Sequence, residues 1–145
     1  MNQTKTRLTQ QESPIIIGRL RNTQYAFMWD KTYLLSELPS DEETQEEVEF
    51  IRDALELQPG AIVLDLCCGN GRHGRLLADA GMRVIGVDSS RFLLEDARKN
   101  AISTECGIHL VEGDMRRIPL KPMCDAVINL FTSFGFFEEN DNRRV

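Results

Sequence analysis

The stretch that decides the fold is Ala61-Ile-Val-Leu-Asp-Leu-Cys-Cys-Gly-Asn-Gly71, in which an apolar run ends in a glycine loop. A second apolar run, 82–87, ends at Asp88, 17 residues after Gly71. An α/β sheet holds a nucleoside in this way: the loop backbone approaches the ligand closely, and the carboxylate after the next strand accepts hydrogen bonds from two ribose hydroxyls. The sequence therefore predicts a nucleoside-binding α/β domain.

The composition is that of an ordinary globular protein. The 145 residues suffice for one domain with a real core, and 41% of them are hydrophobic and 28% charged. We expect a cytoplasmic protein without a membrane segment, because no apolar stretch approaches ~20 residues and the N-terminus lacks the apolar core of a signal peptide. The net charge of −6, without a basic patch interleaved with aromatics, gives no support to nucleic-acid binding.

The cysteines do not have the spacing of metal ligands, so we expect no metal site and reduced thiols; they are Cys67, Cys68, Cys106 and Cys124. Cys67 and Cys68 are predicted to be small packing residues rather than nucleophiles, because no adjacent base is indicated.

Two units are expected along the chain. Residues 1–24 are polar and aperiodic, which predicts a mobile tail, with local docking of Ile15-Ile16-Ile17 left open. Residues 25–145 form the predicted domain. Its aromatic segment Tyr25–Tyr33 is too apolar for solvent and is expected to pack over the ligand edge or the core.

Capping and periodicity predict the elements. Ser40 and Glu43 form a capping box for a helix that ends at Pro59-Gly60, with a buried stripe of Val48, Ile51, Ala54 and Leu55. Strands are expected over 61–66, 82–87, 108–112 and 125–131, and helices over 71–80 and 90–101. In the second of these helices, Phe92, Leu93 and Ala97 are expected to face inward. This alternation predicts a parallel sheet with helices on both faces.

The loop pattern Gly69-x-Gly71-x-x-Gly74 matches a dinucleotide fingerprint, but Asp65 argues against a dinucleotide. A pyrophosphate would sit at the helix N-terminus, where a nearby carboxylate would repel it. S-adenosylmethionine has no phosphate and carries a sulfonium and an ammonium, so electrostatics favour it over NAD. It stays open whether Asp65 instead caps a turn or pairs with Arg72 or Arg75.

Four motifs carry a family resemblance: Val63-Leu-Asp-Leu-Cys-Cys-Gly-Asn-Gly-Arg-His, Gly86-Val-Asp-Ser-Ser, Glu112-Gly-Asp-Met-Arg and Asp125-Ala-Val-Ile-Asn-Leu-Phe-Thr-Ser-Phe-Gly. In this order and spacing, from about residue 44 to 140, they resemble class I S-adenosylmethionine-dependent methyltransferases, in particular the branch that acts on small molecules. The resemblance implies a Rossmann-like α/β fold, S-adenosylmethionine as the cofactor, and methyl transfer to an acceptor that the sequence does not identify.

The resemblance also implies a role for each matching residue. Asp65, Cys67, Gly69, Asn70 and Gly71 would wrap the methionine part, with Asp65 near the ammonium. Asp88 would hold the ribose, with Ser89 beside it, and Asp114 and Met115 would contact the adenine. Asn129, Leu130 and Phe131 would face the sulfonium and the acceptor. No general base is implied, since methyl transfer from a sulfonium requires mainly alignment.

For several of these residues a structural role competes with the binding role. Asp88 is a candidate cap for the next helix, and Asp114 and Asn129 are candidate turn residues. His73 is open between orienting a ligand and a structural role beside Arg72. The phenylalanines at 131, 134, 136 and 137 could form either a substrate wall or core.

The resemblance implies a seven-stranded sheet in the order 3-2-1-4-5-7-6, of which this chain would hold the 3-2-1-4 half. We therefore expect a chain truncated after its fourth strand, 125–131, whose exposed edge favours self-association or a partner chain carrying the other half. Alternatives are a truncated, non-catalytic module that binds S-adenosylmethionine and, less favoured, an NAD(P)-dependent oxidoreductase.

Overall fold

The structure is a computed structural model that describes residues 15–17, 38–102, 107–118, 123–131, 133–135 and 137–145. The aromatic segment Tyr25–Tyr33, Cys106 and all of the expected tail except residues 15–17 lie outside the described residues.

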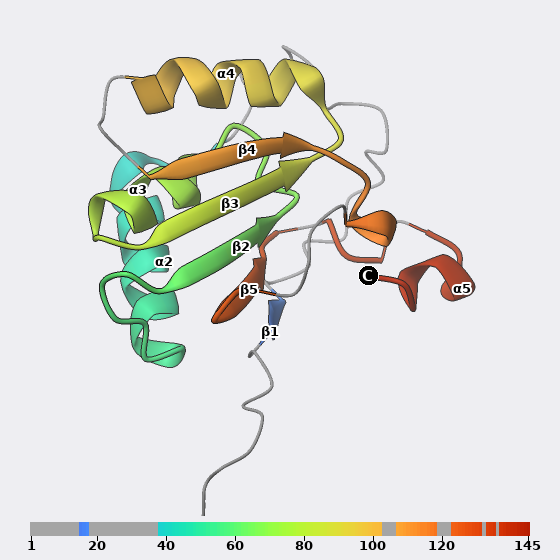
Figure 1. Cartoon of the computed structure of the whole chain (residues 1–145), viewed down its shortest axis with the longest axis horizontal. Helices are drawn as coiled ribbons and strands as arrows, with labels where there is room; N and C mark the ends of the chain where they lie inside the picture. The colour runs from blue at the N-terminus through green and yellow to red at the C-terminus, as the bar shows by residue number, and fades with distance from the viewer. Residues whose placement is uncertain (1–14, 18–37, 103–106, 119–122, 132, 136) are drawn as a thin grey trace, which may run out of the picture.

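A five-stranded parallel sheet in the order β1-β5-β2-β3-β4 forms the centre of the fold (Figure 1). Its strands are β1 (Ile15–Ile17), β2 (Ile62–Leu66), β3 (Arg83–Asp88), β4 (Ile108–Glu112) and β5 (Ala126–Asn129). The predicted order 3-2-1-4 is confirmed, because the four strands predicted from the alternating pattern lie as β4-β3-β2-β5. Parallel pairing brings the carboxyl ends of all these strands to one edge.

The expectation of an exposed fourth strand is wrong, because β1 pairs in parallel with β5 from Ile15↔Val127 to Ile17↔Asn129. An unpaired strand edge is a row of free N–H and C=O groups, and a β-branched tripeptide is well suited to cover it. A run of three residues is too short to show a period, and its partner lies more than a hundred positions away along the chain.

The helices are α2 (Asp41–Ala54), α3 (Arg72–Asp79), α4 (Arg91–Ile102), the 3₁₀ helix η1 (Met115–Arg117) and α5 (Glu139–Asn142). Helices α3 and α4 begin and end within one residue of the predicted positions, whereas α2 ends at Ala54, well before the predicted Pro59-Gly60, and the two short helices η1 and α5 were not predicted. The predicted capping box is present: Ser40 Oγ accepts from the Glu43 N–H at 3.1 Å, and Glu43 Oε2 accepts from the Ser40 N–H at 2.8 Å. None of the described helices is both long and apolar enough to cross a membrane.

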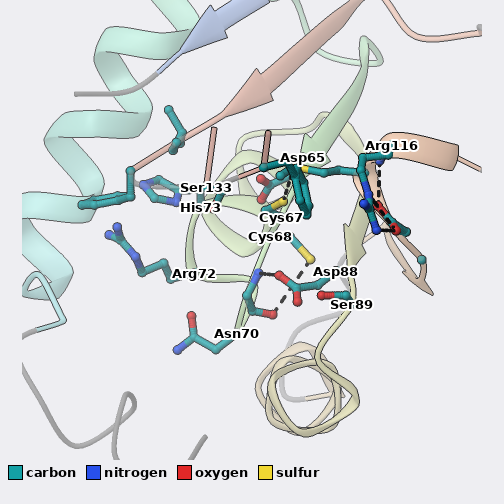
Figure 2. A pocket seen from close by; sticks show the side chains of 17 residues that line it. Asp65, Cys67, Cys68, Asn70, Arg72, His73, Asp88, Ser89, Arg116 and Ser133 are labelled. Carbon is teal, nitrogen blue, oxygen red and sulfur yellow. Dashed lines mark hydrogen bonds and ion pairs between the residues drawn. The ribbon is translucent and has the colours of Figure 1, made fainter. Parts of the chain in front are cut away.

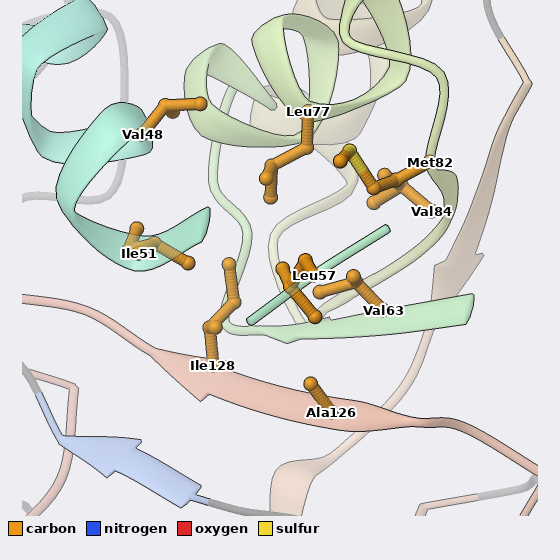
Figure 3. Packing of buried hydrophobic residues seen from close by; sticks show 9 residues of the cluster. All are labelled: Val48, Ile51, Leu57, Val63, Leu77, Met82, Val84, Ala126 and Ile128. Atoms are coloured by element: carbon orange, nitrogen blue, oxygen red, sulfur yellow. The ribbon is translucent and has the colours of Figure 1, made fainter. Parts of the chain in front are cut away.

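One face of the sheet packs against α2 and α3 (Figure 3). Its buried cluster consists of Val48, Ile51, Leu57, Val63, Leu77, Met82, Val84, Ala126 and Ile128. Two expected core residues are exposed. Ala54 points to solvent because α2 ends there and the chain turns to bury Leu57 instead. Phe92 is 42% exposed because Leu93, Leu94 and Ala97 occupy the inward face of α4.

Shorter elements cover the opposite face. Leu64, Leu66 and Val87 are buried there against Met115 of η1, and Phe137 and Val145 pack on the same cluster. The segment that contains α5 therefore folds back over the sheet near the carboxyl ends of β2 and β3. This arrangement brings η1 and Phe137 beside the loops that the sequence assigns to ligand binding.

Substituting Gly86 by Ala is expected to destabilise the protein by about 1–3 kcal/mol. A Cβ on Gly86 would lie 2.8 Å from Cys68 Sγ and 2.9 Å from Leu110 Cδ2, so these side chains would have to move, and Cys68 Cβ, at 3.2 Å, limits the room for that movement. Urea unfolding measures the change, with Gly107→Ala as the control because its Cβ would meet only Met82 O, at 3.9 Å. Equal stability of the two variants would contradict the tight contact between β3 and the loop after β2.

Candidate functional site

A cavity of about 450 Å³ lies at the carboxyl ends of the strands, where open α/β sheets bind their ligands (Figure 2). Loops that follow β2, β3, β4 and β5 all contribute to it. The lining residues are Asp65, Cys67, Cys68, Gly69, Asn70, Arg72, His73, Asp88, Ser89, Gly113, Asp114, Met115, Arg116, Leu130, Phe131, Ser133 and Phe137. All cofactor residues predicted from the sequence are among them except Gly71 and Asn129.

Backbone hydrogen bonds fold the loop between β2 and α3 against β3. The N–H groups of Cys67 and Cys68 both donate to Val87 O, at 2.7 and 3.1 Å. Cys67 and Gly69 adopt positive φ values of 63° and 55°. A positive φ is unusual for a cysteine and stores strain, which is typical of binding sites. Gly71 has φ 74°, and a Cβ at this position would lie 3.2 Å from Ala97 Cβ. Because glycine has no side chain, the start of α3 can lie close to α4.

Asp88 binds this loop through one carboxylate oxygen and the segment before α4 through the other. Oδ2 accepts from the Gly69 N–H and Oδ1 from the Ser90 N–H, each at 2.8 Å. Burial raises the pKa of this carboxyl, and the backbone donors act against that rise. The predicted alternative was that Asp88 caps α4, but it is Ser90 Oγ that accepts from the Leu93 N–H in the first turn of this helix, at 3.3 Å. Each oxygen keeps a further lone pair for a hydroxyl of a ligand.

Asp65 is a buried carboxylate with an unsatisfied oxygen. It is 3% exposed, and its Oδ2 has no hydrogen-bond partner among the described residues. Burial, reinforced by the charge of Asp88, raises its pKa to about 7. Of the two arginines that the sequence offered as partners, Arg72 acts on Asp65 through its charge, which lowers the pKa, and Arg75 instead lies 3.8 Å from both Asp41 and Asp79. Such a group is well placed to receive a cationic ligand, because a cation would offset the cost of a buried charge.

At one end of the cavity, Arg116 binds Asp114, the carboxylate that is predicted to contact the adenine. Its backbone N–H and guanidinium donate to Asp114 at 2.6–3.1 Å, and these bonds hold the Asp114 pKa at about 2. Arg116 also donates to Asp141 of α5 at 2.7 Å and stacks over Phe137 at 4.2 Å. The predictions missed Arg116, whose only sequence signal is its position two residues after Asp114.

At the other end, α2 and α3 meet through a polar network. Arg72 Nη1 donates to Thr44 Oγ1 at 2.8 Å and to Glu47 Oε2 at 3.1 Å, and His73 Nε2 lies 2.8 Å from the same Glu47 oxygen. Burial lowers the pKa of His73, while hydrogen bonds from His73 and Arg72 lower that of Glu47. A neutral His73 that donates to a charged Glu47 fits both shifts. His73 thus both lines the cavity and ties two helices together.

The end of β5 supplies the remaining wall. Leu130 and Phe131 line the cavity, and Phe131 has a positive φ of 65°. Asn129 is 3% exposed, does not line the cavity, and has no hydrogen-bond partner for either side-chain polar atom among the described residues. Cys67 lies 3.2 Å from the Met115 sulfur, and burial raises its pKa to about 12, so its thiol is protonated.

The comparisons with known proteins identify the family. A family model described as a methyltransferase domain matches residues 63–145, and the chain belongs to this family. The chain is 34% identical over 84 residues to a cypemycin N-terminal methyltransferase of a Streptomyces species, an alignment that covers 58% of this chain and 34% of that protein. The predicted family membership and the Rossmann-like fold are therefore confirmed.

Solved structures agree with this family. The CcbJ methyltransferase from Streptomyces caelestis superposes with a TM-score of 0.65 at 27% identity, over 79% of this chain and 48% of that one. Magnesium protoporphyrin IX methyltransferase from Synechocystis, with bound S-adenosylhomocysteine, gives 0.52 at 26% identity, over 61% of this chain and 41% of that one. This chain spans less than half the length of each of these three proteins. The neighbours agree with S-adenosylmethionine as the predicted cofactor.

Replacing Asp65 by Asn is expected to stabilise the ligand-free protein at pH 8 but much less at pH 4.5. Because burial gives Asp65 a folded-state pKa of about 7, against 3.8 for an aspartate exposed to water, folding favours the protonated acid, and stability is lost as pH rises between these values. The gain at pH 8 is of the order of 2–4 kcal/mol.

Urea unfolding at the two pH values measures this difference. Asp53→Asn is the matched control, because Asp53 is exposed on α2 and remote from the cavity. If Asp65→Asn changes the free energy of unfolding equally at both pH values, the claim that Asp65 is buried and ionises with a raised pKa is contradicted.

Proposed function

We propose that this chain binds S-adenosylmethionine in the cavity and forms the cofactor-binding part of an enzyme that transfers the sulfonium methyl to a small-molecule acceptor. The observation that carries the proposal is Asp65, a fully buried carboxylate with an unpartnered oxygen at the end of the central strand β2. A cation in the cavity that Asp65 lines would offset the charge of this carboxylate, whereas the pyrophosphate of a dinucleotide would be repelled.

The remaining cavity residues fit the same ligand. Asp88, held by the loop backbone, would accept the ribose hydroxyls with its spare lone pairs, and Ser89 lies beside it. Met115 is buried and lines the cavity next to Asp114, where it would offer an apolar surface to the adenine ring. Asp114 already accepts from Arg116, so an adenine amino group would use the acceptor capacity that remains on its oxygens.

The chemistry that the cofactor supplies is an activated methyl group on a sulfonium. The chain's own residues would bind and orient it. The charge of Asp65 would favour a cation in the cavity, and the partly buried loop at 67–71 would limit the access of water from that side. An in-line displacement needs alignment above all, and no described residue has to act as a base.

A small-molecule acceptor is supported by the walls of the cavity and by the structural neighbours. Leu130, Phe131, Ser133 and Phe137 form a largely apolar wall with one hydroxyl, next to the end of β5. Magnesium protoporphyrin IX methyltransferase, which this chain resembles in structure, is named for a small-molecule acceptor. The acceptor would enter from this side, because the sequence predicts that Leu130 and Phe131 face the sulfonium that carries the methyl group.

Calorimetric titration tests the proposed cofactor. S-adenosylmethionine and S-adenosylhomocysteine are expected to bind with micromolar Kd, equivalent to about −8 kcal/mol, and NADH is expected not to bind. Asp88→Ala should abolish binding and also cost about 1–3 kcal/mol of stability, because the Gly69 and Ser90 N–H groups lose their acceptor.

Circular dichroism melts define a temperature at which Asp88→Ala is folded, and Asp53→Ala serves as the control for loss of one acidic side chain outside the cavity. NADH binding, or undiminished binding of S-adenosylhomocysteine by folded Asp88→Ala, would contradict the proposal. Binding without methyl transfer to any of a panel of small amines and alcohols would favour the alternative of a non-catalytic binding module.

A further inference from the structure

The amino-acid end of S-adenosylmethionine carries two opposite charges, an ammonium and a carboxylate. This inference rests on the proposed function, which assigns the ammonium to Asp65. The carboxylate is then an anion that must be accommodated at the same end of a cavity that holds the carboxylates Asp65 and Asp88. Burying it without a cation or hydrogen-bond donors would be costly.

Two arginines line the cavity among the described residues. Arg116 is bound to two carboxylates and keeps two of its five N–H donors, whereas Arg72 is bound to one carboxylate and keeps three. Arg116 uses Nε, Nη1 and Nη2, all of which donate to Asp114 or Asp141. Arg72 donates through Nη1 alone, to Thr44 and Glu47. The Nε and Nη2 donors of Arg72 have no hydrogen-bond partner within the described part of the chain, and neither of these atoms is fully buried.

Arg72 is also held in place before any ligand arrives. Its side chain is 15% exposed, its Nη1 is fixed by two acceptors on α2, and its guanidinium lies over the Phe131 ring at 4.3 Å. Glu47, which accepts from Arg72, is itself bound by His73 at 2.8 Å. A guanidinium fixed in this way loses little conformational freedom when it binds an anion.

The position of Arg72 fits the orientation of the cofactor. In Figure 2, Arg72 and Asn70 lie at one side of the cavity and Arg116 at the other, with Asp88 and Ser89 between them. Ribose at Asp88 and adenine beside Met115 would direct the methionine part toward Arg72. Arg72 is also the first residue of α3, so the carboxylate would approach the positive end of that helix.

We propose that Arg72 binds the carboxylate of the cofactor's methionine part through Nε and Nη2, and that Glu47 is the positioning residue that aims it. Asp65 and Arg72 would then complement the two charges of the methionine part. The Asp65 carboxylate would lie toward the ligand's ammonium and the Arg72 guanidinium toward its carboxylate. Bidentate contact of this kind is the geometry in which arginine recognises carboxylates.

The test compares two ligands that differ only in the carboxylate: S-adenosylhomocysteine and its decarboxylated analogue, in which hydrogen replaces that group. Calorimetry is carried out on wild type, Arg72→Gln, Arg72→Lys and Glu47→Gln. The matched control is Arg75→Gln, because Arg75 lies one turn further along α3 and does not line the cavity.

Wild type should bind S-adenosylhomocysteine about 10–100-fold more tightly than the analogue. Arg72→Gln should lose that preference while keeping its affinity for the analogue, which also shows that the variant's site is folded. Arg72→Lys should keep part of the preference, Glu47→Gln should reduce it without abolishing analogue binding, and Arg75→Gln should leave it unchanged.

Two results would overturn this inference while leaving the proposed function intact. The first is an undiminished preference for S-adenosylhomocysteine in Arg72→Gln. The second is an equal loss of affinity for both ligands in that variant, which would show that Arg72 only connects α3 to α2. Wild type that binds neither ligand would overturn the proposed function, and this inference with it.

Discussion

The binding site depends on the burial of Asp65 at the end of β2. This strand lies between β3 and β5, so its end is the point where loops from several strands converge. A carboxylate there with an unpartnered oxygen is a cost to the folded chain, and the pKa of about 7 expresses that cost. A cation bound beside Asp65 would offset this cost. The burial that destabilises the unpaired charge also strengthens its attraction to a cationic ligand.

The surrounding residues hold this carboxylate in place. Val87 O accepts from the N–H groups of Cys67 and Cys68, and Asp88 accepts from the Gly69 N–H, so the loop after β2 is fastened to the end of β3. Gly86 gives Cys68 the room it needs above β3. At the two ends of the cavity, Arg116 connects η1 to α5, and Glu47 connects α2 to α3. The site is thus built from backbone contacts in its centre and charged side chains at its ends.

Much of this could be predicted from the sequence, because the signals are local. The apolar runs gave β2 to β5, the capping box at Ser40 gave the start of α2, and the motif residues at the strand ends gave most of the cavity lining. The misses involve distant partners. The pairing of β1 with β5 joins segments far apart in the chain, and Arg72 and Arg116 each bind an acceptor 25 residues away, Glu47 and Asp141 respectively. No local pattern reports such contacts.

The most direct test of the central claim is the number of protons released when S-adenosylhomocysteine binds at pH 6.5, obtained by calorimetry in buffers of different ionisation enthalpy. With a pKa of about 7, Asp65 is mostly protonated in the free protein, and a cation beside it would lower that pKa and expel the proton. The account predicts release of most of one proton by wild type, and much less by any Asp65→Asn protein that still binds. Binding by wild type without proton release would show that Asp65 does not meet the cation.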